Sequence, residues 1–150
     1  MQLAETFNDV ADLYDATRPS YPSALFETLV GAAGLEAGDP VLEVGCGTGQ
    51  ATEGLRREGL AVTALDPGPE LIRHARRRFG DHDDLVFVTA KFEDWEPPRA
   101  AFRLLASAQA WHWIPSPTAF AKAAEALAPG GVLAVFGNVP AALSEADLEM

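Results

Sequence analysis

The chain has 150 residues, of which 48% are hydrophobic and 22% are charged, and its formal net charge is −11. This composition predicts one folded domain and excludes a disordered chain, because disordered chains have too little apolar surface to bury. The acidic balance argues against a protein whose main task is to bind nucleic-acid phosphates, since such proteins present a basic face.

Cysteine content and terminal composition exclude further classes. Cys46 is the only cysteine, which leaves no intrachain disulfide and no cysteine-rich metal site. The first residues lack the basic and apolar regions of a secretory signal, and no apolar run is long enough to span a bilayer. We therefore expect a cytoplasmic protein without a metal site, a membrane contact or a nucleic-acid partner.

The first 36 residues predict a helical cap. Apolar residues follow a helical period over residues 7–16 and again over residues 23–33, and the proline-containing segment 18–22 separates the two helices. Residues 37–137 are expected to form an α/β core. Residues 138–150 are interpreted as a truncated tail.

Apolar segments alternate with helical segments throughout the core. The expected strands are residues 41–44, 61–65, 85–88, 102–107 and 132–136, and the expected helices are residues 48–58, 69–79 and 116–128. This alternation predicts a Rossmann-like, doubly wound parallel sheet with helices on both faces.

Three glycines in alternate positions, Gly45, Gly47 and Gly49, directly follow the first expected strand. Glycine allows backbone angles that a Cβ forbids, and a ligand can approach the bare backbone at the start of the next helix. The spacing differs from the G-x-G-x-x-G of dinucleotide sites, which disfavours NAD. Glu43 is a carboxylate in an otherwise apolar strand, and it predicts a nearby polar site because an unpartnered buried carboxylate is costly.

Residues 43–49, which read E-x-G-x-G-x-G, resemble the first motif of the class I S-adenosylmethionine-dependent methyltransferases. The resemblance covers nearly all of the chain. It implies the strand order 3-2-1-4-5, S-adenosyl-L-methionine as the cofactor, and a glycine loop that wraps the methionine end of that cofactor. Residues 14–22 and 109–113 are similar to segments of a methyltransferase type 11-like subgroup. Residues 127–131, which read L-x-P-G-G, resemble the family's Pro-Gly-Gly turn into the fifth strand.

An acid, Asp66, ends the second expected strand. One carboxylate at this place can accept hydrogen bonds from both hydroxyls of a ribose, so Asp66 supports a nucleoside ligand without choosing between cofactors. The structural alternative is a cap for the helix that follows Pro67, and the two roles are compatible. Cys46 is a conceivable nucleophile, but a small side chain tolerated in a tight turn is the favoured interpretation.

The resemblance places the residues after the third strand at the adenine. Phe92 is expected to offer its backbone N–H and ring to the base, and Glu93 keeps a residue of the family pattern. Lys91 departs from the pattern, because the family has an acid there and an ammonium group cannot accept a hydrogen bond.

His112 lies between two tryptophans after the fourth strand, at the sheet edge where α/β proteins build their sites. It is a candidate general base, with structural packing as the alternative, and no catalytic residue is assigned. Tyr14 and Arg18 are expected to meet the carboxylate end of the cofactor, or else to serve as an amphipathic anchor and a surface ion-pair partner. The expected cofactor-binding residues are Tyr14, Arg18, Glu43, Gly45, Cys46, Gly47, Gly49, Asp66, Pro67, Phe92, Glu93 and Ser107.

The leading hypothesis is methyl transfer from S-adenosylmethionine to a small-molecule substrate by direct displacement. A non-catalytic or truncated S-adenosylmethionine-binding protein is the second hypothesis, and an NAD-dependent oxidoreductase domain is the third. The family fold continues with two strands that the chain lacks, so the fifth strand is expected to be an exposed apolar edge. The chain is accordingly interpreted as a fragment, or as a subunit of a homodimer that covers this edge.

Overall fold

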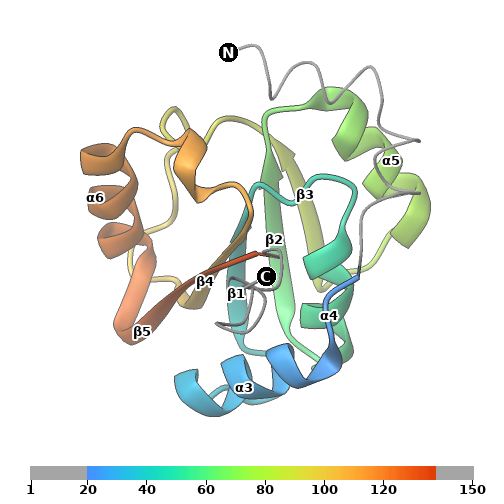
Figure 1. Cartoon of the computed structure of the whole chain (residues 1–150), viewed down its shortest axis with the longest axis horizontal. Helices are drawn as coiled ribbons and strands as arrows, with labels where there is room; N and C mark the ends of the chain where they lie inside the picture. The colour runs from blue at the N-terminus through green and yellow to red at the C-terminus, as the bar shows by residue number, and fades with distance from the viewer. Residues whose placement is uncertain (1–19, 138–150) are drawn as a thin grey trace, which may run out of the picture.

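The computed structural model describes residues 20–137, which form a single five-stranded sheet with helices on both faces (Figure 1). The first expected helix, Tyr14, Arg18 and the tail at 138–150 lie outside the described residues. The elements are α3 (Ser23–Ala33), β1 (Pro40–Val44), α4 (Gln50–Arg57), β2 (Ala61–Asp66), α5 (Pro69–Phe79), β3 (Leu85–Thr89), β4 (Phe102–Ala108), the 3-10 turn η1 (Trp111–Trp113), α6 (Ser116–Ala126) and β5 (Leu127–Phe136).

The strand order is β3-β2-β1-β4-β5, and all four strand pairs are parallel. This confirms the order and the fold class expected from the sequence. The order reverses between β1 and β4, and such a reversal leaves a crevice outside the carboxyl ends of the two strands, where α/β sheets bind ligands.

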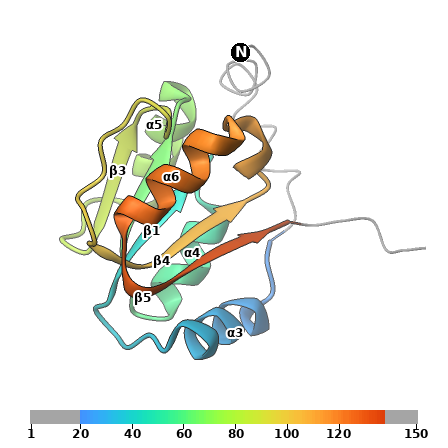
Figure 2. The same ribbon diagram turned by 90° about the vertical axis from the view of Figure 1, so that its left-hand side faces the viewer.

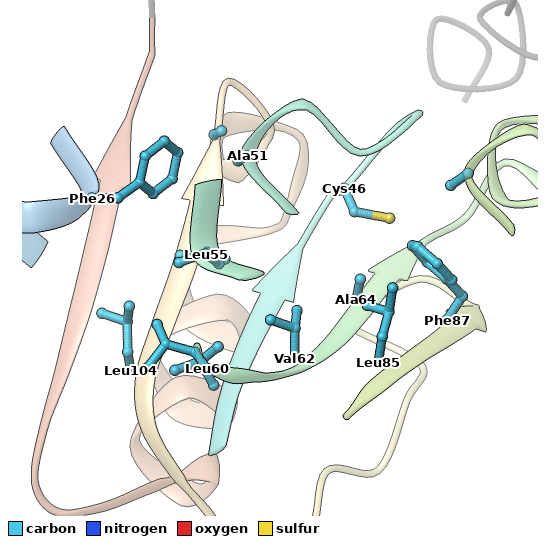
Figure 3. Packing of buried hydrophobic residues seen from close by; sticks show 14 of the residues in the cluster. Phe26, Cys46, Ala51, Leu55, Leu60, Val62, Ala64, Leu85, Phe87 and Leu104 are labelled. Carbon is cyan, nitrogen blue, oxygen red and sulfur yellow. The ribbon is translucent and has the colours of Figure 1, made fainter. Parts of the chain in front are cut away.

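The helices cover the two faces unequally. In Figure 2, α6 lies in front of the sheet and α4 lies behind it. Buried residues of α3, α4 and α5 join one apolar cluster, whereas α6 contributes to the cluster on the other face. Figure 3 shows side chains of the first cluster, from Phe26 of α3 across to Phe87 of β3. The sheet is therefore buried on both sides, which explains the near-continuous apolar strands.

Two expected helix boundaries were wrong by two residues. The helix after the glycines begins at Gln50 and not at residue 48, because Gly49 has a φ of 103°, outside the helical range. The last helix ends at Ala126 and not at residue 128, because Leu127 is already extended and pairs with Phe102 of β4.

The fifth strand begins earlier than expected, at Leu127. Its pairing with β4 shifts register, since Phe102 faces Leu127 but Leu104 faces Val132. The residues 128–131 between these two pairings include a glycine at a φ of 78°. The expected Pro-Gly-Gly turn is thus an irregular first half of β5, and regular pairing starts at residue 132 as expected.

Within residues 20–137, β5 pairs with β4 alone and forms one edge of the sheet. Val135 of this strand is 51% exposed. Phe136 is partly buried, and its ring makes edge contacts with Tyr21 at 5.4 Å and with Phe26 at 6.4 Å. The expected exposed apolar edge is therefore exposed only in part, because α3 covers one face of the carboxyl end of β5.

None of the helices in residues 20–137 combines the length and the apolar character needed to cross a bilayer. The same residues contain no group of three His, Cys, Asp or Glu side chains arranged to hold a metal ion.

Candidate functional site

The glycine loop, residues 45–49, leaves the carboxyl end of β1 and is fastened to the end of β2. The N–H groups of Gly45 and Cys46 both donate to the carbonyl oxygen of Leu65, at 2.7 and 3.0 Å. Gly45, Gly47 and Gly49 have φ angles of 77°, 56° and 103°. All three lie in the range that side chains with a Cβ rarely adopt, which confirms the conformational reason given for the glycines.

Two of these glycines also permit close packing. A Cβ on Gly45 would lie 2.2 Å from the Cβ of Ala110, and a Cβ on Gly49 would lie 2.3 Å from the ring of Phe79. Ala110 follows β4, and Phe79 ends α5. The loop is thus packed between the segment after β4 and the end of α5. These two contacts were not predictable from the sequence, because they join residues far apart in the chain.

Asp66, at the end of β2, points at the glycine loop. Its Oδ2 accepts a hydrogen bond from the N–H of Gly47 at 2.9 Å, and its Oδ1 accepts one from the N–H of Gly68 at 2.8 Å. The residue is 8% exposed. The expected cap of the next helix was wrong, because the N-cap of α5 is Gly68 and has no side-chain cap hydrogen bond. The Asp66 carboxylate instead closes a turn to Gly68 across the half-buried Pro67. One carboxylate therefore ties together the two turns that follow β1 and β2.

Glu43 lies inside β1 and is 1% exposed. The hydroxyl of Thr52, in the first turn of α4, donates to its Oε1 at 2.5 Å. This partner fits the reasoning that a buried carboxylate needs hydrogen-bond donors. Thr52 was missed by the sequence analysis, because only the packing of α4 over β1 reveals which helical residue reaches Glu43.

Cys46 is 3% exposed, and its thiol donates to the carbonyl of Gly47 at 3.7 Å. Burial raises the pKa of the Cys46 thiol well above its ordinary value, and the nearby carboxylates of Glu43 and Asp66 raise it further. A thiol with a raised pKa stays protonated at neutral pH and is a poor nucleophile. The environment thus favours the interpretation of Cys46 as a small residue in a tight turn.

Ser107 of β4 is fully buried, and its hydroxyl donates to the carbonyl oxygen of Val44 at 2.9 Å. The hydrogen bond links β4 to the last residue of β1, directly before the glycine loop. Ser107 therefore supports the loop from within the sheet.

An aromatic group lies beside the carboxyl end of β4. Phe92 is buried and packs against Trp111 at a ring distance of 6.2 Å, and Trp111 packs against Phe120 of α6 at 5.6 Å. Glu93 is half-buried, and Lys91 is exposed. Phe92, one of the residues expected at the adenine, thus belongs to an apolar wall. Lys91, which differs from the acid of the family pattern, faces solvent.

His112 is exposed, and its ring lies 4.6 Å from that of Trp113. The expectation that His112 lies beyond the fourth strand is confirmed, since η1 follows β4 after two residues. His112 lies two residues after Ala110, which packs on Gly45 of the glycine loop, and its role as a base stays a prediction.

Gln109 begins the segment 109–113 that resembles a methyltransferase subgroup, but it was not among the expected site residues. It is a non-glycine residue with a φ of 58°, an uncommon conformation that is often found at functional sites. Its Oε1 accepts a hydrogen bond from the Tyr21 hydroxyl at 3.0 Å, and its N–H donates to the carbonyl of Phe136 at 2.8 Å. No sequence signal marks a glutamine for this backbone conformation.

The sheet is parallel with the order 3-2-1-4-5, a glycine loop follows β1, and the acid that ends β2 accepts a hydrogen bond from this loop. These features define an α/β protein of the Rossmann-like class. Residues 41–131 match the family described as methyltransferase domain. The chain belongs to this methyltransferase family, and it has the fold of the class I S-adenosylmethionine-dependent methyltransferases.

Three similar proteins agree with this assignment. A methyltransferase of Mycobacterium tuberculosis is 32% identical over 133 residues, which cover 89% of this chain and 52% of that protein. The trans-aconitate 2-methyltransferase of Afipia carboxidovorans is 36% identical over 98 residues, 63% of this chain and 37% of that protein. A solved structure from Anaeromyxobacter dehalogenans, assigned to the type II methyltransferases, is 35% identical with a TM-score of 0.69, over 81% of this chain and 50% of that one.

The chain spans about half the length of the curated relatives that it matches over most of its own length. Membership of the methyltransferase family leaves no support for the third hypothesis, an NAD-dependent oxidoreductase domain.

Proposed function

We propose that the chain binds S-adenosyl-L-methionine and transfers its methyl group to a small-molecule acceptor. The observation that carries the proposal is the hydrogen bond between Asp66 and the N–H of Gly47, because it brings the acid of β2 onto the glycine loop of β1. A carboxylate has about four acceptor positions. Its contact with the loop is therefore compatible with hydrogen bonds to ribose hydroxyls.

The cofactor would lie along the carboxyl ends of β1, β2 and β3. In this arrangement the glycine loop holds the methionine end, Asp66 and Pro67 hold the ribose, and Phe92 and Glu93 hold the adenine. Glu43 and Ser107 are buried below the loop and stabilise it indirectly. Glu43 accepts a hydrogen bond from Thr52 of α4, and Ser107 donates one to Val44 of β1. Tyr14 and Arg18 remain proposed ligands for the carboxylate end.

S-adenosylmethionine supplies a methyl group on a positively charged sulfur, an electrophile that a well-placed nucleophile attacks directly. The chain's task is then alignment and exclusion of water. Phe92 and Trp111 provide an apolar wall for that purpose. The acceptor nucleophile would displace the sulfur in line, forming one bond to the methyl carbon as the carbon–sulfur bond breaks, and its proton would leave to solvent.

One kind of relative supports a small acceptor. One of the similar proteins is named for trans-aconitate, a small carboxylic acid. We propose an acceptor of comparable size for this chain, bound near the segment after β4 that packs on Gly45.

Calorimetry with S-adenosylmethionine tests the binding half of the proposal. We expect saturable binding that Asp66→Asn weakens about tenfold, because the amide loses one acceptor oxygen and the negative charge. Asp81→Asn is the matched control, since Asp81 is an exposed acid after α5. Equal affinities for the two variants would contradict the proposed role of Asp66.

Measurement of turnover tests the methyl-transfer part of the proposal. Formation of S-adenosylhomocysteine is measured with a panel of small carboxylic acids, amines and alcohols. Binding without turnover of any acceptor would support the second hypothesis, a non-catalytic S-adenosylmethionine-binding protein, which the exposed Lys91 at an expected acid position favours.

We also propose that a second copy covers the edge of β5. Val135 is exposed, and within residues 20–137 its strand pairs on one side alone. Both observations support a homodimer, because open strand edges promote pairing with another chain. Light scattering after gel filtration tests it, with Val135→Lys as the disrupting variant. A monomer at all concentrations would reject the homodimer.

A further inference from the structure

The carboxyl end of α5 contacts the glycine loop directly. Phe79, the last residue of α5, fills the space beside Gly49, where a Cβ would lie 2.3 Å from its ring. The preceding residue, Arg78, reaches the same place, and its guanidinium carbon lies 5.2 Å from the centre of the Phe79 ring, within the range of a cation–π contact.

Arg78 makes three polar contacts with the loop and with the first turn of α4. It donates to Oε1 of Gln50 at 2.5 Å and to Oε2 of Glu53 at 2.7 Å. A longer contact of 3.4 Å joins its Nη1 to the carbonyl oxygen of Thr48, inside the loop. One guanidinium thus spans the junction at which the loop becomes a helix.

Glu53 is shared with a second arginine. Arg57, one turn further along α4, donates to Oε1 of Glu53 at 2.8 Å. Both arginines therefore satisfy the same carboxylate, but within residues 20–137 only Arg78 of the two also contacts Thr48 and Gln50. Comparing substitutions of the two arginines therefore distinguishes a change in the conformation of the glycine loop from a change in the charge pairing on α4.

We propose that Arg78 is a positioning residue that fixes the conformation of the glycine loop and so raises the affinity for S-adenosylmethionine. It acts through Thr48 and Gln50, whose backbone and side chain it restrains at the carboxyl end of the loop. The inference rests on the proposed function, since it assumes that the loop holds this cofactor.

The test compares Arg78→Ala with Arg57→Ala in the full chain. Calorimetry with S-adenosylmethionine is expected to show about tenfold weaker binding for R78A, a loss typical of hydrogen bonds to a charged group. R57A is expected to bind within about twofold of the unmodified chain, because it removes an exposed ion pair of small energetic weight. R78K is expected to recover part of the loss, since a lysine keeps the charge but not the planar fork.

Amide hydrogen exchange over residues 47–50 gives a readout that needs no cofactor. Faster exchange is expected in R78A and not in R57A. Equal cofactor affinities for R78A and R57A, or unchanged loop exchange in R78A, would overturn the inference. Absence of binding by the unmodified chain would instead reject the proposed function, and hydrogen exchange alone would then decide the role of Arg78.

Discussion

The carboxylate of Asp66 accepts hydrogen bonds from the N–H groups of Gly47 and Gly68, at 2.9 and 2.8 Å. The two donors belong to the turns that follow β1 and β2. The acid therefore stabilises the fold at the place where the ligand is proposed to bind, and its two roles are separable by experiment.

Replacing Asp66 by alanine is expected to lower the free energy of unfolding by about 2 kcal/mol, because two N–H groups lose a charged acceptor in a nearly buried place. Urea denaturation measures this change. Asp66→Asn keeps one acceptor oxygen and should lose less. Equal stability of all three proteins would show that the two N–H groups find other acceptors.

Gly49→Ala is expected to destabilise the protein by about 3 kcal/mol, which combines an unfavourable backbone angle with a clash against Phe79. Gly34→Ala is the matched control. Gly34 also has a positive φ, 63°, but nothing lies within 4 Å of its Cβ position, so the expected loss is about 1 kcal/mol. Similar losses measured by urea denaturation would argue against tight packing by Phe79.

Two glycines within helices are expected to respond in opposite directions. Gly31→Ala in α3 should stabilise the protein by about 0.5–1 kcal/mol, because nothing lies near the added methyl and alanine favours a helix. Gly54→Ala in α4 should destabilise it by about 1–3 kcal/mol, because the methyl would lie 2.1 Å from the buried ring of Phe26. Melting temperatures give the signs directly, and a stabilising Gly54→Ala would contradict the contact with Phe26.

Thr52→Val keeps the shape of the side chain but removes the hydroxyl that donates to Glu43. We expect a loss of about 2 kcal/mol in the free energy of unfolding, since the carboxylate stays buried after losing a donor. Adding Glu43→Gln to Thr52→Val should recover part of this loss, because a neutral amide is less costly to bury. A double variant less stable than Thr52→Val alone would contradict the explanation.

The raised pKa of Cys46 predicts a loss of stability at alkaline pH. The unfolded thiol releases its proton near its ordinary pKa of about 8.5, while the folded thiol keeps it, so the native state binds more protons. Stability contributed by this group is therefore complete below about pH 8.5 and falls as the pH rises toward the higher folded pKa. Its slope is at most about 1.4 kcal/mol per pH unit.

Cys46→Ala isolates this effect, because other groups titrate in the same range. The difference in unfolding free energy between the two proteins should decrease from pH 8 to pH 10, measured by urea denaturation. A difference that does not change with pH would mean that the thiol ionises equally well in the folded chain.

The sheet was predictable because each strand is a short apolar run between turn residues. Burial on both faces makes such runs continuous, and residues 41–44 and 61–65 were placed to within one residue. Helix ends near Gly49 and Leu127 were less predictable, since one depends on a positive φ and the other on pairing with Phe102.

The site was predictable to the extent that its residues follow strands directly. Asp66 and the glycine loop meet because β1 and β2 are adjacent and parallel. The partners Thr52 and Phe79 were not predictable, because their contacts depend on how α4 and α5 pack on the sheet. The left-handed backbone of Gln109 likewise arises from long-range contacts with Tyr21 and Phe136.

The methyl group of Ala110 occupies the space that a side chain on Gly45 would need. A larger residue at position 110 would press on the glycine loop just as a side chain at position 45 would. Attempts to select for the proposed methyl transfer to other acceptors by randomising the segment after β4 should therefore retain Ala110, or glycine in its place. Bulky replacements there would be selected against through loss of affinity for the proposed cofactor before any change in the choice of acceptor became measurable.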